Sequence, residues 1–236
     1  MQKMDLADKN PLRIFARNSE GNPVEKRMGL LMSRPGLGKT AILVQIALDN
    51  ILRGNQVLHV SIGQSLDKTR LWYDDIFKDI FADVTPEETN ELHDEVLRNR
   101  LIMTFKEADF TRPKLEERVN DLVAQDVFRP TCIIIDGYDF DNTDQQTVAD
   151  VKDMADVLGL HVWFSALCHR DDERQSAEGV PAPCHEVGGY FDTVVMIQAE
   201  KDKPNLSLIV VKDNTGCVKQ GKALDLDPST YLAKEA

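Results

Sequence analysis

Long hydrophobic runs are missing from this sequence of 236 residues. No apolar stretch approaches the ~20 residues that a helix needs to cross a bilayer, so the sequence does not predict a membrane-spanning protein. The first residues, MQKMDLADKNPLRIFARNSEG, also lack the continuous apolar stretch of a secretory signal. We therefore expect a protein of the cytoplasm that does not act in a membrane.

Cysteines are few and scattered. The sequence contains Cys132, Cys168, Cys184 and Cys217, and none of them belongs to a CxxC motif. This pattern predicts free thiols in a reducing compartment and not a disulfide framework. Cys168-His169 and Cys184-His185 together offer four residues of the types that bind zinc, but adjacent side chains diverge and the spacing matches no common zinc module. We therefore favour free thiols over a zinc site.

Positive charge is also in short supply. Lysine and arginine number 28 against 40 aspartates and glutamates, which gives a formal net charge of -12. Such a chain repels a nucleic-acid backbone unless a local basic patch overrides the overall field. The stretch HRDDERQSAEG offers no such patch, because Arg170 and Arg174 stand there beside four acids. A nucleic-acid partner is therefore disfavoured.

Apolar stretches of strand length alternate with stretches of helical periodicity. A helix is expected from Thr40 to a stop at Gly54, another begins at Pro86, and a later one turns Val148, Val151, Ala155 and Leu158 inward. This alternation predicts an α/β fold with a mainly parallel central sheet flanked by helices, whose ligands gather at the carboxyl ends of the strands. The expected parallel strands are 28–33, 56–62, 101–105, 131–136 and 160–167.

The C-terminal part has a different pattern. Residues 168–189 are polar and rich in proline and glycine, which predicts a long loop. Segments 191–198, 206–212 and 217–226 follow as consecutive antiparallel strands, with KDNTG as a hairpin turn. The predicted organisation is an N-terminal extension (1–27), one domain (28–231) and a short tail (232–236).

The segment SRPGLGKT at 33–40 nearly spells the phosphate-binding loop G-x-x-x-x-G-K-[ST] between a strand and a helix. Glycines allow backbone N–H groups to point at a phosphate, and lysine and threonine reach the β- and γ-phosphates and Mg²⁺. Ser33 stands in the first glycine position, where a negative φ suffices. The predicted nucleotide-binding residues are Ser33, Arg34, Pro35, Gly36, Leu37, Gly38, Lys39, Thr40 and Ala41.

A second element is the apolar stretch TCIIID, which ends in Asp136. An aspartate at the end of such a strand holds Mg²⁺ in nucleotide-binding proteins. The simpler alternative is an aspartate that caps the turn after a strand. Together with Lys39 and Thr40, the metal role is favoured, so that Thr40 and Asp136 are the predicted Mg²⁺ residues and ATP or ADP the predicted ligand.

These stretches resemble the RecA-like P-loop ATPases, above all the ATPase domain of DnaB-type replicative helicases, with KaiC-like proteins as cousins. The resemblance covers about residues 28–231. It is carried by MSRPGLGKTAILVQIALDN, VLHVSIGQSLDKTR, TCIIIDGYDF, VKDMADVLGLHVWFSALCHR and the closing strands. It implies a RecA-like fold that binds ATP with Mg²⁺.

The sequence departs from that family at the hydrolytic positions. Gly63 stands where the family has a water-positioning glutamate, Ala166 where it has a γ-phosphate-sensing glutamine, and Asn214 where it has an arginine finger, although Lys212 of the same turn is kept. Loss of an arginine finger alone removes ~10³ to 10⁵ in rate. The candidates that could take over catalytic work are Gln64, Asp67, Asp139 and His169.

We therefore expect a domain that binds Mg²⁺ with ATP or ADP, hydrolyses slowly or not at all, and serves as a regulatory or assembly module. One alternative is an active ATPase or helicase-like motor that acts on nucleic acid. The other is a scaffold that has lost nucleotide binding. A homo-oligomer or a protein partner is compatible with each of these.

Overall fold

The computed structural model describes residues 10–15, 27–169, 171–199 and 206–234. Their centre is a nine-stranded sheet with the order β3-β2-β4-β5-β1-β6-β7-β8-β9. The first six strands in that order are parallel, and β7, β8 and β9 continue the sheet in antiparallel fashion. The strands are β1 Arg27–Ser33, β2 Val57–Ile62, β3 Arg100–Phe105, β4 Cys132–Asp136, β5 His161–Leu167, β6 Thr193–Ala199, β7 Leu206–Asp213, β8 Ala223–Leu226 and β9 Ala233–Lys234.

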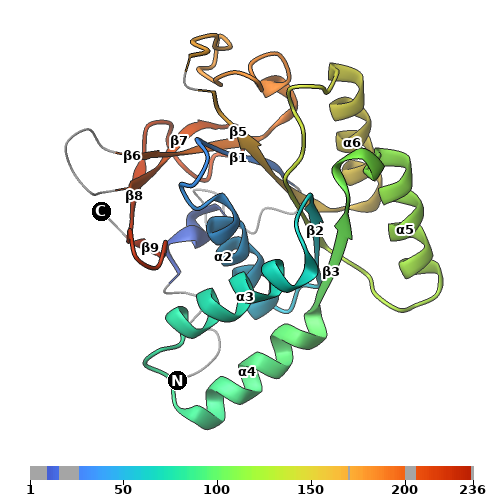
Figure 1. Cartoon of the computed structure of the whole chain (residues 1–236), viewed down its shortest axis with the longest axis vertical. Helices are drawn as coiled ribbons and strands as arrows, with labels where there is room; N and C mark the ends of the chain where they lie inside the picture. Colours follow the sequence, from blue (N-terminus) through green and yellow to red (C-terminus); the bar gives the residue numbers. More distant parts are fainter. Residues whose placement is uncertain (1–9, 16–26, 170, 200–205, 235–236) are drawn as a thin grey trace.

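Helices cover both faces of this sheet (Figure 1). Helices α2, α3 and α4 pack on one face, and α5 and α6 pack on the other, each face having its own hydrophobic core. The helices are α2 Lys39–Leu52, α3 Leu66–Ile80, α4 Pro86–Asn99, α5 Arg112–Ala124 and α6 Gln145–Leu158, with short 3-10 segments η1 Pro11–Phe15, η2 Glu107–Asp109 and η3 Gly188–Tyr190. The predicted α/β class with C-terminal antiparallel strands is confirmed.

Helix α2 is buried around its whole circumference from Ala41 to Leu52. The sequence pattern predicts an apolar stripe here, but the polar residues of this helix are buried too. Gln45 donates from Nε2 to the carbonyl of Tyr231 at 2.8 Å and accepts from the N–H of Ala233 at 3.1 Å. Such partners remove the cost of burying an amide, and they fasten the C-terminal segment to α2.

Three local predictions were wrong. Leu158, expected inside, is 41% exposed, because Met154 and Ala155 already complete the buried side of α6. The strand expected at 217–226 begins only at Ala223, because the Asp213 carboxylate accepts hydrogen bonds from the N–H groups of Cys217 and Val218 and curls the chain away from the ladder. KDNTG is therefore no tight hairpin.

The polar stretch 168–189 is a loop, as predicted, but its second half is anchored in the core. Val180, Ala182, Cys184 and Val187 are all buried. Burial raises the pKa of the Cys184 thiol. This residue is therefore a packing residue of the second core and not a thiol on an exposed loop.

Segments on both sides of 28–231 contact the same body. Leu12 and Phe15 of η1 belong to the first core, and β9 pairs with β8. Within the described residues, no helix combines the length and apolarity needed to cross a membrane.

His59 lies on β2, fully buried, and its Nδ1 is 3.1 Å from the hydroxyl of Tyr73. Its other ring nitrogen, Nε2, is buried with no hydrogen-bond partner among the described residues. Burial lowers the pKa of His59 to about 4, since a charged imidazolium would lose its hydration. The imidazole is therefore neutral in the folded protein at neutral pH.

This burial predicts acid sensitivity. The unfolded chain binds a proton at His59 near the ordinary pKa of 6.5, whereas the folded chain resists it down to about pH 4. The free energy of unfolding should therefore fall by about 3 kcal/mol between these pH values. Urea unfolding at several pH values measures this, with His59→Asn as the comparison. A variant that shows the same slope as the wild type would contradict the assignment, and pH 8 gives the pH-independent effect of the substitution.

Candidate functional site

The SRPGLGKT segment forms a turn between β1 and α2, as expected. Ser33 is the last residue of β1, where an extended backbone needs no glycine, and Gly36 and Gly38 have φ of +80° and +90°. Helix α2 begins directly after Gly38. A Cβ on Gly38 would also lie 2.4 Å from the ring of Tyr231, so this position is closed to other residues twice over.

Lys39 points back across this turn. Its Nζ donates to the Ser33 Oγ at 3.4 Å, which gives the serine in the first glycine position a role of its own. Burial lowers the pKa of Lys39, and the nearby carboxylate of Asp136 partly offsets that shift. A partly desolvated ammonium group of this kind gains strongly from an anionic ligand.

Asp136 ends β4 and is buried between two hydroxyl groups. Thr40 Oγ1 donates to its Oδ2 at 2.7 Å, and Ser165 Oγ donates to its Oδ1 at 2.6 Å. Ser165 in turn accepts from the N–H of Gly137 at 2.9 Å. The two predicted Mg²⁺ residues are therefore in direct contact, and their oxygen atoms suit the hard Mg²⁺ ion.

Sequence analysis missed Ser165. The signal was a single hydroxyl group inside the otherwise apolar run HVWFSAL, in a strand predicted to lie in a parallel sheet. Its importance depends on the pairing of β5 with β4, which brings the ends of the two strands together. That pairing cannot be read from the position of Ser165 alone.

A cavity of about 1160 Å³ opens between the P-loop and the ends of β2, β3 and β4. Lys39, Thr40 and Asp136 line its floor. Trp72 and Tyr231 line it as well, with ring centroids 6.2 Å apart in an edge-to-face contact. The cavity therefore combines a cationic and oxygen-rich floor with flat apolar surfaces.

The four predicted catalytic candidates do not gather at one point. Gln64 lines the cavity, and its Oε1 is buried without a hydrogen-bond partner among the described residues. Asp139 also lines it, but its carboxylate accepts from the N–H groups of Asp141 and Asn142 and so shapes a turn. Asp67 is exposed in the first turn of α3 and lies outside the cavity lining.

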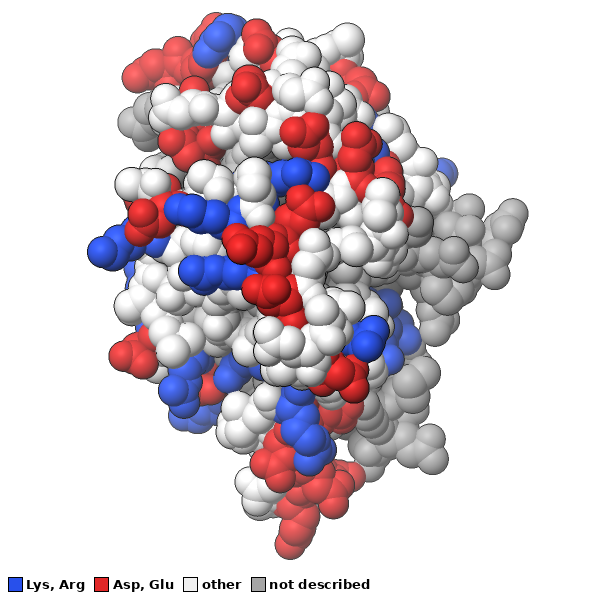
Figure 2. Space-filling model, turned by 90° about the vertical axis from the view of Figure 1, so that its right-hand side faces the viewer, with Lys and Arg blue, Asp and Glu red and all other residues white. Residues whose placement is uncertain are grey.

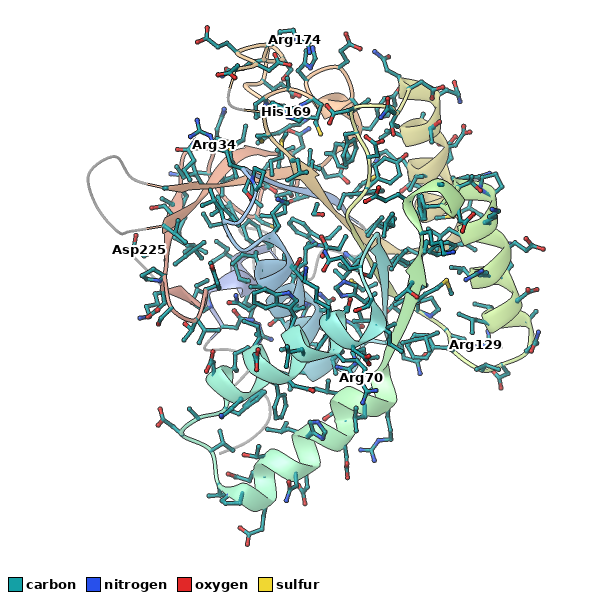
Figure 3. The ribbon with its side chains drawn as sticks, viewed as in Figure 1. Arg34, Arg70, Arg129, His169, Arg174 and Asp225 are labelled. Atoms are coloured by element: carbon teal, nitrogen blue, oxygen red, sulfur yellow. The ribbon has the colours of Figure 1, made fainter. Side chains whose placement is uncertain are left out.

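His169 lies on the loop after β5 (Figure 3). Its Nε2 is 2.9 Å from Asp141 Oδ2, and it is not among the residues that line the P-loop cavity. Arg174 on the same loop pairs with Asp172 at 2.6 Å. The described residues of this loop thus direct their charged groups at one another.

Gly63 has φ of +73°, in the left-handed region that favours glycine. A Cβ placed there would lie 2.6 Å from the Oε1 of Glu107, a residue that follows β3 and lines the same cavity. Sequence analysis did not identify Glu107. The only signal was an acid two residues beyond a strand end, which becomes informative once β3 is known to pair with β2.

Lys212, kept from the family's turn, is turned into its own chain. Its side chain is buried, and its Nζ donates to the carbonyl of Gly188 at 3.1 Å and pairs with Glu178 at 2.6 Å. Asn214 is exposed in the connection that follows. Lys212 therefore fastens the 168–189 loop to β7.

This arrangement is the RecA-like P-loop fold, the fold of the ATPase domains of DnaB-type helicases. A solved structure of one such helicase ATPase domain matches the chain with a TM-score of 0.68 and 15% sequence identity, over 99% of this chain and 95% of that one. At this identity the likeness establishes the fold. No protein-family model and no curated protein sequence matches the chain.

The contacts of Asp136 predict the effect of removing one hydroxyl group. Ser165→Ala leaves the N–H of Gly137 and an oxygen of Asp136 without their partner, so the free energy of unfolding should fall by about 1–3 kcal/mol. Urea unfolding measures it. In a double-mutant cycle with Asp136→Asn, the two effects should be strongly non-additive. Additive effects would show that the two side chains do not stabilise each other. Ser61→Ala, which removes a buried hydroxyl bonded to Thr69, is the matched control.

Proposed function

We propose that this domain binds ATP or ADP together with Mg²⁺ in the cavity between the P-loop and β4. The observation that carries the proposal is the direct contact of Thr40 with Asp136 beside the half-buried ammonium of Lys39. A P-loop threonine and a strand-end aspartate are the usual Mg²⁺ partners in this fold. A chain that had kept only the shape of the fold would have little reason to hold these three groups together, which disfavours the scaffold alternative.

Each part of the cavity has a role in this proposal. The backbone N–H groups around Gly36 and Gly38 face the phosphates, Lys39 neutralises the β- and γ-phosphate charge, and Thr40 and Asp136 hold Mg²⁺. When bound, Mg²⁺ neutralises phosphate charge and fixes the phosphate geometry. The rings of Trp72 and Tyr231 offer flat surfaces to the base.

We further propose that turnover is slow and that the domain acts as a regulatory or assembly module. Three hydrolytic positions of the family hold Gly63, Ala166 and Asn214. Lys212 supports the same interpretation, because a lysine engaged with Gly188 and Glu178 is not free for a neighbouring subunit. A domain that holds its nucleotide for long periods is suited to reporting which nucleotide is bound, to a protein partner or to another copy of itself in the cytoplasm.

A motor that acts on nucleic acid has less support. On the face that Figure 2 shows, Lys and Arg are interspersed with Asp and Glu among the described residues, and no continuous basic area forms. The net charge of -12 adds a general repulsion. Phosphate release measured with and without single-stranded DNA separates the two functions, since clear stimulation by DNA would favour the motor.

Nucleotide binding is tested with Lys39→Ala. Loss of the ammonium removes charge-assisted contacts worth about 1.5–3 kcal/mol, so the Kd of a fluorescent ATP analogue with Mg²⁺ should rise about 10- to 100-fold. Fluorescence anisotropy measures the Kd. Lys78→Ala, which removes an exposed lysine at the last turn of α3, is the matched control and should bind like the wild type. Equal affinity in all three proteins would refute the proposed site.

A further inference from the structure

The space in front of Gly63 is taken by a carboxylate from another strand. Glu107 Oε1 lies 2.6 Å from the point where a Cβ on residue 63 would stand, and its Cγ lies 3.0 Å from that point. A side chain on residue 63 and the present position of Glu107 are therefore mutually exclusive. The glycine at this position makes room for the glutamate.

The sheet explains how Glu107 reaches this place. Strands β2 and β3 are parallel neighbours with Ile62 beside Phe105, and the N–H of Gly63 donates to the carbonyl of Phe105 at 2.9 Å. The chain then turns into η2 at Glu107. Since parallel strands end at the same edge of a sheet, a residue just beyond β3 can serve the same cavity as one just beyond β2.

Glu107 differs from the other nearby carboxylates in being unengaged. It forms no hydrogen bond or ion pair with any described residue, whereas Asp139 is bound to the N–H groups of its own turn. Gln64, beside Gly63, lines the same cavity with an unpartnered Oε1. Glu107 and Gln64 thus place two free acceptor groups on the wall opposite the P-loop, and a water molecule is held by such a pair.

We propose that Glu107 is the catalytic carboxylate of a slow ATP hydrolysis in this domain, an inference that rests on the nucleotide binding proposed above. A water molecule, oriented by Glu107 and by Gln64, attacks the γ-phosphorus. The new bond joins the water oxygen to phosphorus, and the bond between phosphorus and the β,γ-bridging oxygen breaks with its electron pair on ADP. The water proton passes to the Glu107 carboxylate, which later releases it to solvent. The products are ADP and inorganic phosphate.

The function of the family's missing glutamate is, in this inference, moved from β2 to the adjacent strand. Turnover stays slow because the groups at 166 and 214 are still lacking. The module therefore has an internal clock that resets its nucleotide state, and Glu107 sets the rate of that clock.

The test compares the wild-type chain with Glu107→Gln. Binding of the fluorescent ATP analogue with Mg²⁺ gives the Kd, and single-turnover release of radiolabelled γ-phosphate gives the rate. Glu107→Gln keeps the shape of an exposed side chain and removes its basicity, so the Kd should stay within about threefold while the rate falls at least ~100-fold. Asp109→Asn is the matched control, because it makes the same change in the same short segment outside the cavity lining. It should leave both quantities unchanged.

A second variant reaches the same carboxylate from the other side. Gly63→Ala would put a methyl group where the Glu107 side chain now lies, so it should also slow phosphate release while Glu107 itself is intact. Thermal unfolding checks that this variant is folded.

The outcomes are distinct. A wild-type rate that Glu107→Gln leaves within about threefold would overturn the inference, and so would tight binding with no detectable wild-type turnover. Both results leave the proposed nucleotide site standing. Failure of the wild type to bind the analogue would instead refute the nucleotide site, and the inference with it.

Discussion

The pairing of Thr40 with Asp136 is the contact on which the rest of the site depends. It joins the first turn of α2 to the end of β4, two elements that lie 96 residues apart in the chain. Ser165 on β5 grips the other oxygen of the same carboxylate. A buried carboxylate that accepts two short hydrogen bonds from neutral donors keeps most of its charge available to a cation, while its position is fixed from both sides.

The environment of α2 explains why this contact is stable. A surface helix is held by one face, but α2 is enclosed by the sheet, by α3 and α4 and by the C-terminal strands. Gln45 binds the segment at 231–233 through two hydrogen bonds and thereby places the ring of Tyr231 against Gly38. The phosphate-binding turn is thus supported from beneath by the helix and from the side by a residue near the other end of the chain.

Much of this architecture was predictable from the sequence, because β1, β2, β4 and β5 are short apolar runs whose burial on both faces leaves an obvious pattern. Thr85 and Pro86 likewise mark the start of α4 by known capping chemistry. Prediction failed where neighbours in space decide the outcome. Leu158 has the right spacing for burial yet stays partly exposed, and the start of β8 is set by hydrogen bonds to Asp213. Ser165 and Glu107 gain their meaning only from the strand order.

Glu107 also shows why the loss of a catalytic residue cannot be judged from one aligned position. Gly63 taken alone indicates a missing carboxylate. Its positive φ and the carboxylate lying against it indicate that the backbone and the neighbouring strand are adapted to each other, since a glutamate at 63 would meet both a strained φ and an occupied space. Ala166 and Asn214 have no such replacement, and Lys212 is committed to the loop it holds. The hydrolytic groups of the fold therefore fall into two kinds in this chain: one whose chemistry has an alternative source at the same edge of the sheet, and others that are absent. The first kind sets whether a phosphate can be cleaved at all, and the second sets how slowly.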